Sequence, residues 1–202
     1  MKRFFFLLAS LSLAVAVRAD VETYNIDPVH SATGFSVRHL FSKFTSSFTK
    51  TTGKITVDQA NMEHNTVEAT IEIASVSTAN ADREKHLQSP DFFDAANFPT
   101  ATFKSKSWKK TGTDTFDVTG DLTIKGVTKE VVLKVTALGF GPGMRPGTLL
   151  SGWEATTVLK RTDFGVSYGP KILGEDVTVN ISIEAGYKTT PPAPTAVPAK
   201  QG

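Results

Sequence analysis

The chain of 202 residues contains no cysteine. This absence excludes disulfide bonds, thiolate nucleophiles and metal sites built on cysteine ligands. The four histidines form no His-x-x-x-His or comparable pair, so the sequence gives a zinc site little support. We therefore expect neither a metal ion nor a cofactor.

Motifs of two common catalytic classes are also missing. The chain has no Gly-x-Ser-x-Gly nucleophile elbow, and its many Ser and Thr residues have no evident activating base. The glycine-rich stretch "GFGPGMRPG" at 139–147 contains two prolines and no start of a helix. It predicts a hairpin loop instead of a phosphate-binding loop.

Long apolar runs are scarce, and the one at the N-terminus is typical of a secretory signal peptide. Phe4 to Val17 is apolar, follows Lys2 and Arg3, and ends at the small-x-small sequence Val17-Arg18-Ala19. We predict cleavage after Ala19 and a periplasmic or secreted mature protein. The alternative is a retained membrane anchor, which is disfavoured because Arg18 and the polar "DVETYN" follow at once. No second apolar span occurs, so no permanent membrane span is expected.

An excess of positive charge is missing from the mature chain. Loss of residues 1–19 removes three of the 22 Lys and Arg and none of the 20 Asp and Glu, so the formal charge changes from +2 to −1. Nucleic-acid binding is therefore not expected, because it needs a clustered basic surface. Residues 188–202, rich in Pro and Ala, predict a disordered tail, which leaves 20–187 as one domain.

Alternation of apolar and polar residues dominates the domain. In "TVEATIEI", Val67, Ala69, Ile71 and Ile73 share one face and polar residues share the other. The same period predicts strands at 116–124, 131–135 and 177–183, with further candidates around 22–39, 46–58, 101–108 and 149–160. About eight antiparallel strands make an all-β fold. An up-and-down barrel and a two-sheet sandwich both fit this pattern.

The segment "ADREKHLQSPDFF", from Ala81 to Phe93, breaks the alternation. Asn80 can cap a helix, Asp82 suits its first turn, and Pro90 stops it. We predict a short helical insertion around 80–93 that closes one barrel end.

Histidine chemistry supplies the enzymatic alternative. His64 lies in a polar hairpin and is expected to be exposed, whereas His39 has the parity of Phe35 and Val37 and is expected to point inward or lie at a rim. A hydrolase or isomerase of a lipid-like substrate would use His39 or His86 as a general base, oriented by Asp82 or Asp163. A third alternative is a structural or partner-binding module.

Four segments carry a resemblance to a known family: "YNIDPVHSATGFSVRHL", "SVSTANADREKHLQSPDFFDAANFPTATF", "VTGDLTIKGVTKEVVLKV" and "RTDFGV". Across nearly all of 21–187, the chain resembles the YceI-like family of secreted bacterial proteins. The resemblance implies an extended eight-stranded antiparallel lipocalin-like barrel. It also implies a non-catalytic protein that holds a polyisoprenoid or other long-chain amphiphilic lipid. The sequence does not specify the oligomeric state, and a homodimer is compatible with it.

Parity and the resemblance together predict the ligand-binding residues. Seven strand residues are expected to line the interior, namely Phe35, Val37, Val118, Leu133, Trp153, Ala155 and Ile181. Leu87, Phe92 and Phe93 are expected to face the interior from the insertion. If the strand end with Arg38 and His39 meets the helix with Arg83 and His86, these four side chains are available to the headgroup, for example a diphosphate.

Overall fold

The computed structural model describes residues 21–189, and their fold is almost entirely β-sheet. The predicted signal peptide and nearly all of the predicted tail lie outside the described residues. The strands are β1 (Glu22–Ile26), β2 (Ala32–His39), β3 (Ser42–Phe48), β4 (Thr51–Val57), β5 (Thr66–Glu72), β6 (Val76–Ser77), β7 (Thr100–Lys110), β8 (Thr115–Ile124), β9 (Val127–Pro142), β10 (Thr148–Lys160) and β11 (Leu173–Lys188). The helical elements are α1 (Ala81–Gln88) and the short 3₁₀ helices η1 (Met62–His64), η2 (Ile73–Ser75) and η3 (Arg161–Phe164).

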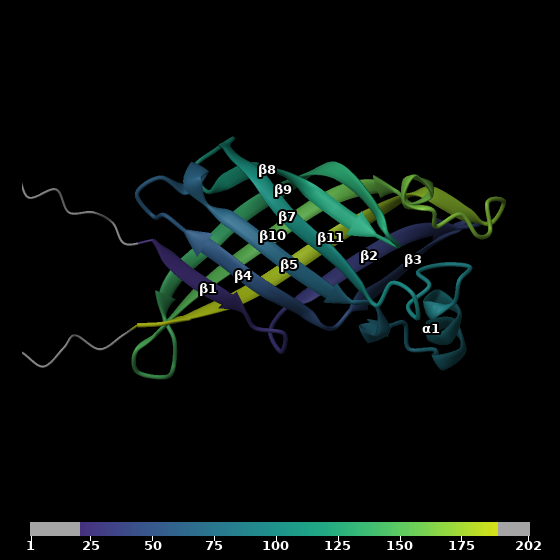
Figure 1. Cartoon of the computed structure of the whole chain (residues 1–202), viewed down its shortest axis with the longest axis horizontal. Helices are drawn as coiled ribbons and strands as arrows, with labels where there is room; N and C mark the ends of the chain where they lie inside the picture. Colours follow the sequence, from purple (N-terminus) through teal and green to yellow (C-terminus); the bar gives the residue numbers. More distant parts are fainter. Residues whose placement is uncertain (1–20, 190–202) are drawn as a thin grey trace, which may run out of the picture.

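The sheet closes on itself, so the fold is a barrel and not a sandwich. Its strand order is β1-β4-β5-β7-β8-β9-β10-β11, and β1 pairs with β11 to close the ring. Beyond this ring, β2 continues along β11 and β3 continues along β2. All pairings are antiparallel, and the barrel is elongated (Figure 1). The prediction of an eight-stranded antiparallel barrel is confirmed.

Two of the expected strands are interrupted. The range 22–39 divides into β1 and β2, and the range 46–58 divides into the end of β3 and β4. The first break contains Pro28, and the Asp27 carboxylate accepts the backbone N–H of Val29, which forms a turn. Together β1 and β2 form one wall strand, as do β3 with β4 and β5 with β6, so that the wall still has eight strands.

The β8–β9 connection is a hairpin that turns at Lys125-Gly126. Both residues have left-handed backbone conformations, with φ of 50° and 75°, as a two-residue hairpin turn requires. A side chain at Gly126 would also meet the Phe98 ring, because an added Cβ would lie 2.6 Å from Phe98 Cε1. Glycine is therefore needed here for conformation and for space.

Aromatic side chains fill the barrel near the end where both termini of the described chain lie (Figure 1). The Tyr24 ring lies 6.1 Å from Phe140 and 5.8 Å from Tyr187. Trp153 packs edge-on against Phe140 at 5.4 Å and against Trp108 at 5.6 Å. This cluster is the core that closes one end of the interior.

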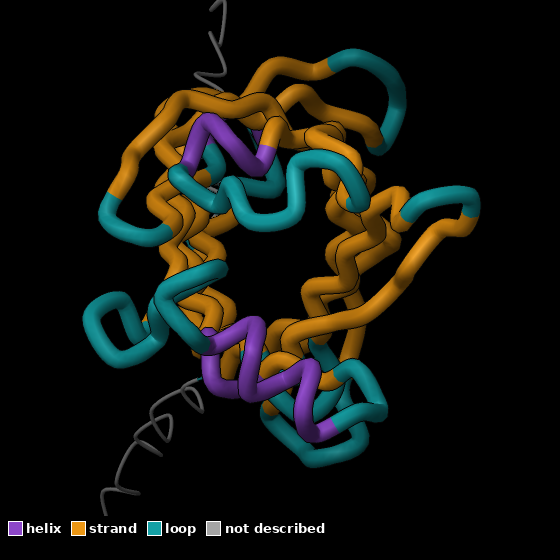
Figure 2. The backbone as a smooth tube through the Cα atoms, turned by 90° about the vertical axis from the view of Figure 1, so that its right-hand side faces the viewer, coloured by secondary structure: helices purple, strands orange, loops and turns teal. Residues whose placement is uncertain are grey.

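The insertion around α1 covers part of the other end, at one side of the ring (Figures 1 and 2). Asn80 caps the helix as predicted, since its side chain accepts the backbone N–H of Arg83. The pairing of β5 with β7 ends at Glu72 and Thr100. The chain between them first forms β6, which pairs with β3, and then leaves the wall. Lys125 then holds the insertion to the β8–β9 turn by donating to the Pro90 carbonyl at 2.7 Å. Figure 2 shows α1 and η3 on opposite sides of this end of the ring.

Candidate functional site

A cavity of about 220 Å³ occupies the barrel interior. Its wall is made by inward-facing residues of the strands and by the insertion, and almost all of the surface that faces it is apolar. Among the described residues, four polar side chains lie in the wall, those of Thr33, Thr51, Thr157 and Arg161. The indole rings of Trp108 and Trp153 also line it. No histidine, aspartate or glutamate of residues 21–189 contributes to the wall. An interior of this kind suits a hydrocarbon chain.

The structure places all seven strand residues chosen by parity on the cavity wall. These are Phe35, Val37, Val118, Leu133, Trp153, Ala155 and Ile181. They share the wall because each occupies an alternate position on a strand whose other face meets solvent. Leu87, Phe92 and Phe93 of the insertion also lie on the wall.

The four polar residues predicted for the headgroup do not line the cavity. Arg83 lies over the Phe44 ring, with 4.7 Å from its guanidinium carbon to the ring centre. Phe44 is opposite Val37, whereas Arg38 is opposite Lys43, which puts Arg38 on the other face of the β2–β3 ribbon. The structure thus brings both segments to one end of the barrel without bringing Arg38 and Arg83 onto one face.

His39 lies at the rim of the barrel and does not point into the cavity. His39 has the expected parity, because it pairs with the wall residue Leu173, but it is exposed. His39 is the last residue of β2, and Leu173 opposite it is the first residue of β11, so both lie where this part of the wall ends.

His86 has a different partner from those predicted. Its Nε2 lies 3.0 Å from Asp91 Oδ2, and Asp91 follows the turn at Pro90. The imidazole also packs edge-on against the rings of Phe92 at 5.0 Å and Tyr168 at 4.9 Å. These contacts connect the insertion to the loop after η3, and Asp82 and Asp163 take no part in them.

Arg161 is a wall residue that we did not predict to bind a ligand. It is only 7% exposed, and its guanidinium donates to the carbonyl groups of Val166, Tyr168, Leu173 and Gly174. Burial lowers the pKa of Arg161 from its usual value. Arg161 therefore holds the loop between η3 and β11 against the cavity. Arg161 begins the "RTDFGV" segment, which is part of the family resemblance. That segment does not show which groups Arg161 contacts.

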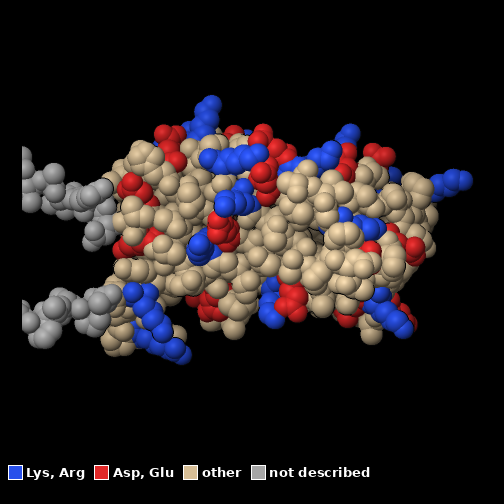
Figure 3. Space-filling model, viewed as in Figure 1, with Lys and Arg blue, Asp and Glu red and all other residues tan. Residues whose placement is uncertain are grey.

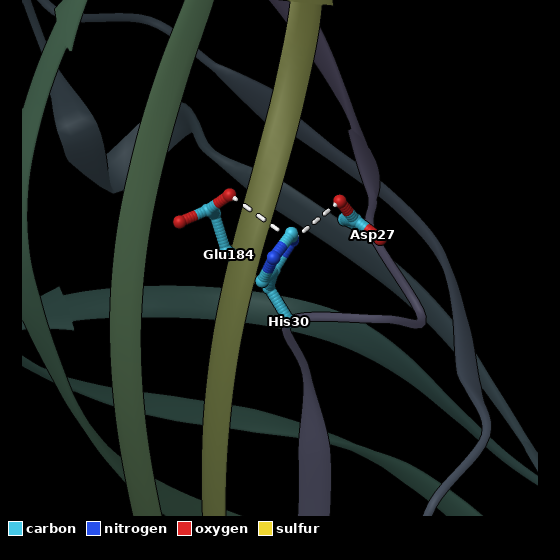
Figure 4. Close-up of side chains that lie close together, drawn as sticks. All are labelled: Asp27, His30 and Glu184. Atoms are coloured by element: carbon cyan, nitrogen blue, oxygen red, sulfur yellow. Dashed lines mark hydrogen bonds and ion pairs between the residues drawn. The ribbon is translucent and has the colours of Figure 1, made fainter. Parts of the chain in front are cut away.

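Asp27, His30 and Glu184 form a separate cluster on the outer surface at the β1–β2 break (Figure 4). His30 Nδ1 lies 2.9 Å from Asp27 Oδ2 and 3.6 Å from Glu184 Oε1. The hydrogen bond with Asp27 raises the pKa of His30, and the same bond lowers the pKa of Asp27. A protonated imidazole is attracted to both carboxylates, so the cluster is accounted for as a surface ion pair.

The remaining surface has mixed charge. On the face shown in Figure 3, Lys and Arg are interspersed with Asp and Glu. Glu68, for example, pairs with Lys54 and Lys104 on the outside of neighbouring strands, as the parity of Glu68 predicted. Within 21–189, no helix has the length and apolarity needed to cross a bilayer.

Comparison with known proteins gives the same picture of the fold. The chain is 40% identical over 184 residues to a UPF0312 protein of Ectopseudomonas mendocina, covering 88% of this chain and 95% of that protein. The crystal structure of a Campylobacter jejuni YCEI protein is 35% identical, with a TM-score of 0.67 over 73% of this chain and 87% of that one. A polyisoprenoid binding domain from Saccharophagus degradans shares the fold at 15% identity, with a TM-score of 0.61 over 85% of this chain and 100% of that one. The model of the YceI-like domain matches residues 24–185, and the chain belongs to the YceI-like family.

Proposed function

We propose that the protein binds a polyisoprenoid or similar long-chain amphiphilic lipid inside the barrel and does not catalyse a reaction on it. The observation that carries this proposal is the apolar cavity, walled by alternate residues around the barrel. The name of the Saccharophagus degradans domain supports it by analogy of fold.

Hydrocarbon burial supplies most of the favourable free energy in such binding. Each methylene moved from water into an apolar interior contributes roughly 0.8 kcal/mol. About ten buried methylenes therefore contribute on the order of 8 kcal/mol, the scale of a micromolar dissociation constant before the cost of association is subtracted. The chain needs few polar contacts to be held.

The headgroup in this proposal stays outside the cavity, at the end covered by α1. The aromatic cluster around Tyr24 fills the opposite end, and the wall offers almost no polar surface to a headgroup. Arg83 and His86 belong to α1 itself, and Arg38 and His39 end β2 at the same end of the barrel. We propose these residues as headgroup contacts, with Arg83 and His86 on the inner side of the ribbon.

We further propose that the mature protein is periplasmic or secreted and begins near Asp20. The support is the sequence of residues 1–19, which lie outside the described part of the chain. The intact mass of protein recovered from the periplasm tests this, and retention of Met1 to Ala19 would overturn it.

The two histidines assigned to the enzymatic alternative do not line the cavity. His39 is exposed at the end of β2, and His86 is paired with Asp91 outside the cavity wall. A catalytic role would need other groups. The partner-binding alternative, with or without a homodimer, does not require that the cavity be occupied.

Mass spectrometry of lipid extracted from the purified protein tests the proposed function. The protein should be isolated from the periplasm without detergent, and its organic extract compared with that of an unrelated exported protein of similar size. An intact long-chain lipid enriched with the protein is the expected result. A consistently empty protein that also binds no added polyisoprenoid would favour the partner-binding module, and a shortened or hydrolysed chain would favour an enzyme.

A further inference from the structure

Apolar side chains are exposed where the β2–β3 hairpin meets the loop after η3. Phe41, at the hairpin tip, is fully exposed at 102%, and Leu40 beside it is also exposed. Tyr168 and Ile172 add exposed apolar surface from the facing loop. The two segments are held together because the Leu40 N–H donates to the Ile172 carbonyl at 2.8 Å. We call residues 38–43 and 168–173 the tip patch.

The tip patch is basic as well as apolar. Its sequences, "RHLFSK" and "YGPKIL", contain Arg38, Lys43 and Lys171 and no acidic residue. None of these three cations forms an ion pair in the part of the chain that the structure describes. The charged strand faces differ, since there Lys and Glu side chains neutralise one another, as around Glu68. The tip patch thus places unpaired cations around exposed apolar groups, and the nearest acids along the chain are Glu175 and Asp176 in the bulge of β11.

The tip patch adjoins the cavity. His39 pairs with Leu173, and both Leu173 and the neighbouring Val37 line the cavity wall. The hairpin and the loop therefore continue the barrel wall outward at the end covered by α1 (Figure 1). A surface that receives the tip patch would face that end of the cavity.

We propose that the tip patch docks the barrel on an anionic lipid bilayer, with Phe41 and Leu40 entering the headgroup region. Exposed apolar groups surrounded by cations are the combination that binds such a surface, because apolar burial adds to attraction by anionic lipids. A stable protein partner would need about 20 to 30 residues on each side, more than the two segments of six residues in the tip patch. A bilayer needs only a few inserted side chains.

Docking on a bilayer is a separate property from the binding of a lipid in the cavity, and it is tested without a polyisoprenoid ligand. The mature protein is mixed with sedimentable vesicles of phosphatidylcholine alone or of phosphatidylcholine with phosphatidylglycerol, neither containing polyisoprenoid. We expect binding to the anionic vesicles and much weaker binding to the neutral ones. High salt should weaken the binding, because it screens the cations of the tip patch.

Two matched variants assign the effect to the tip patch. Phe41→Ser should weaken binding to anionic vesicles roughly tenfold, since a partly buried aromatic ring is lost. Met144→Ser is the control, because Met144 is also fully exposed at 103%, lies next to Arg145, and is in the β9–β10 loop beside Thr189 at the opposite end. It should leave binding unchanged. Both side chains are free of packing contacts with the core, so thermal unfolding should match the parent protein.

Three outcomes would overturn the proposal. The first is no preference for anionic vesicles, and the second is an equal loss in Phe41→Ser and Met144→Ser. The third is a dimer in light scattering that Phe41→Ser converts to a monomer without any vesicle binding, which would make the tip patch an interface between copies. None of these results depends on whether the cavity holds a lipid, so docking and cargo binding can fail separately.

Discussion

Thr33 and Thr51 place their hydroxyl oxygens 3.0 Å apart on the cavity wall, where each side chain is almost fully buried. The pair joins β2 to β4 across the break between β3 and β4. One hydroxyl donates to the other in a wall that is mostly apolar, so the two residues act as a unit.

Replacing one of these threonines should therefore cost more than replacing both. Thr33→Val or Thr51→Val alone leaves a buried hydroxyl unpaired and should lower the free energy of unfolding by about 1 to 3 kcal/mol. The double variant should lie close to the parent protein, because both partners are replaced by apolar groups of the same shape. Urea denaturation of all four proteins measures this coupling. Additive losses would show that the hydroxyls do not depend on each other.

Arg161 should be the most sensitive charged residue of the barrel end. Arg161→Met removes the donors to the carbonyls of Val166, Tyr168, Leu173 and Gly174 and should cost on the order of 3 kcal/mol. Hydrogen exchange should also accelerate in residues 165–174, which the guanidinium holds in place.

Lys160→Met is the control for that variant, because Lys160 is the exposed neighbour of Arg161. It should change stability by less than about 0.5 kcal/mol. Arg161→Lys keeps the charge but not the planar set of donors, and it should fall between the two. If Arg161→Lys matches the parent protein, the hydrogen-bond geometry of the guanidinium is not what holds the loop.

The cavity wall was predictable because strand parity is local. Ile181 and Trp153 could be assigned to the interior from their immediate neighbours, since side chains alternate along any strand. Break points were not predictable from alternation, although Pro28 signals the one between β1 and β2. The insertion was found because its composition differs from that of a strand.

Residues at the barrel end could not be placed from the sequence, because their partners come from distant segments. His86 pairs with Asp91 because the turn at Pro90 brings them together. Tyr168, which packs against His86, comes from a loop 82 positions later. His39 has inward parity but is exposed, because β2 and its neighbour β11 both reach their ends at this pair. Parity assigns a face of a strand, and it does not show where the wall stops.

The His30–Asp27 pair should make stability depend on pH. The fold raises the pKa of His30 above its ordinary 6.5 and lowers that of Asp27 below its ordinary 3.8. The histidine contribution is therefore complete below about pH 6.5 and is lost as pH rises through the raised pKa. The aspartate contribution is complete above about pH 3.8 and is lost as pH falls through the lowered pKa.

His30→Gln should consequently be less stable than the parent protein near pH 5 and nearly equal to it near pH 9, a small effect for so exposed a pair. Urea denaturation at both pH values measures the difference. His64→Gln is a useful comparison, since His64 contacts Asp58 on another exposed turn. An effect of His30→Gln that grows with pH would contradict the assignment of the charged imidazole to this pair.

Ala155 is the position at which the interior can be obstructed most directly. Its side chain is small and lines the cavity, and it lies opposite Ile181 and Val135 on the neighbouring strands. Ala155→Trp should fill much of a cavity of about 220 Å³ and reduce the lipid recovered with the protein at least tenfold. Overpacking should cost about 1 to 3 kcal/mol, which the barrel has to tolerate for the test to be valid.

Two controls make that experiment decisive. Glu154→Trp adds the same ring to the adjacent position, which is exposed on the outer face of β10, and should leave lipid occupancy unchanged. Ala155→Val, a smaller enlargement, should give an intermediate loss, because it fills less of the interior. Lipid per protein, measured by mass spectrometry of extracts from folded material, ranks the variants. Unchanged occupancy in a folded Ala155→Trp protein would mean that the lipid does not pass this point, and an equal loss in Glu154→Trp would mean that it is bound on the outer surface instead.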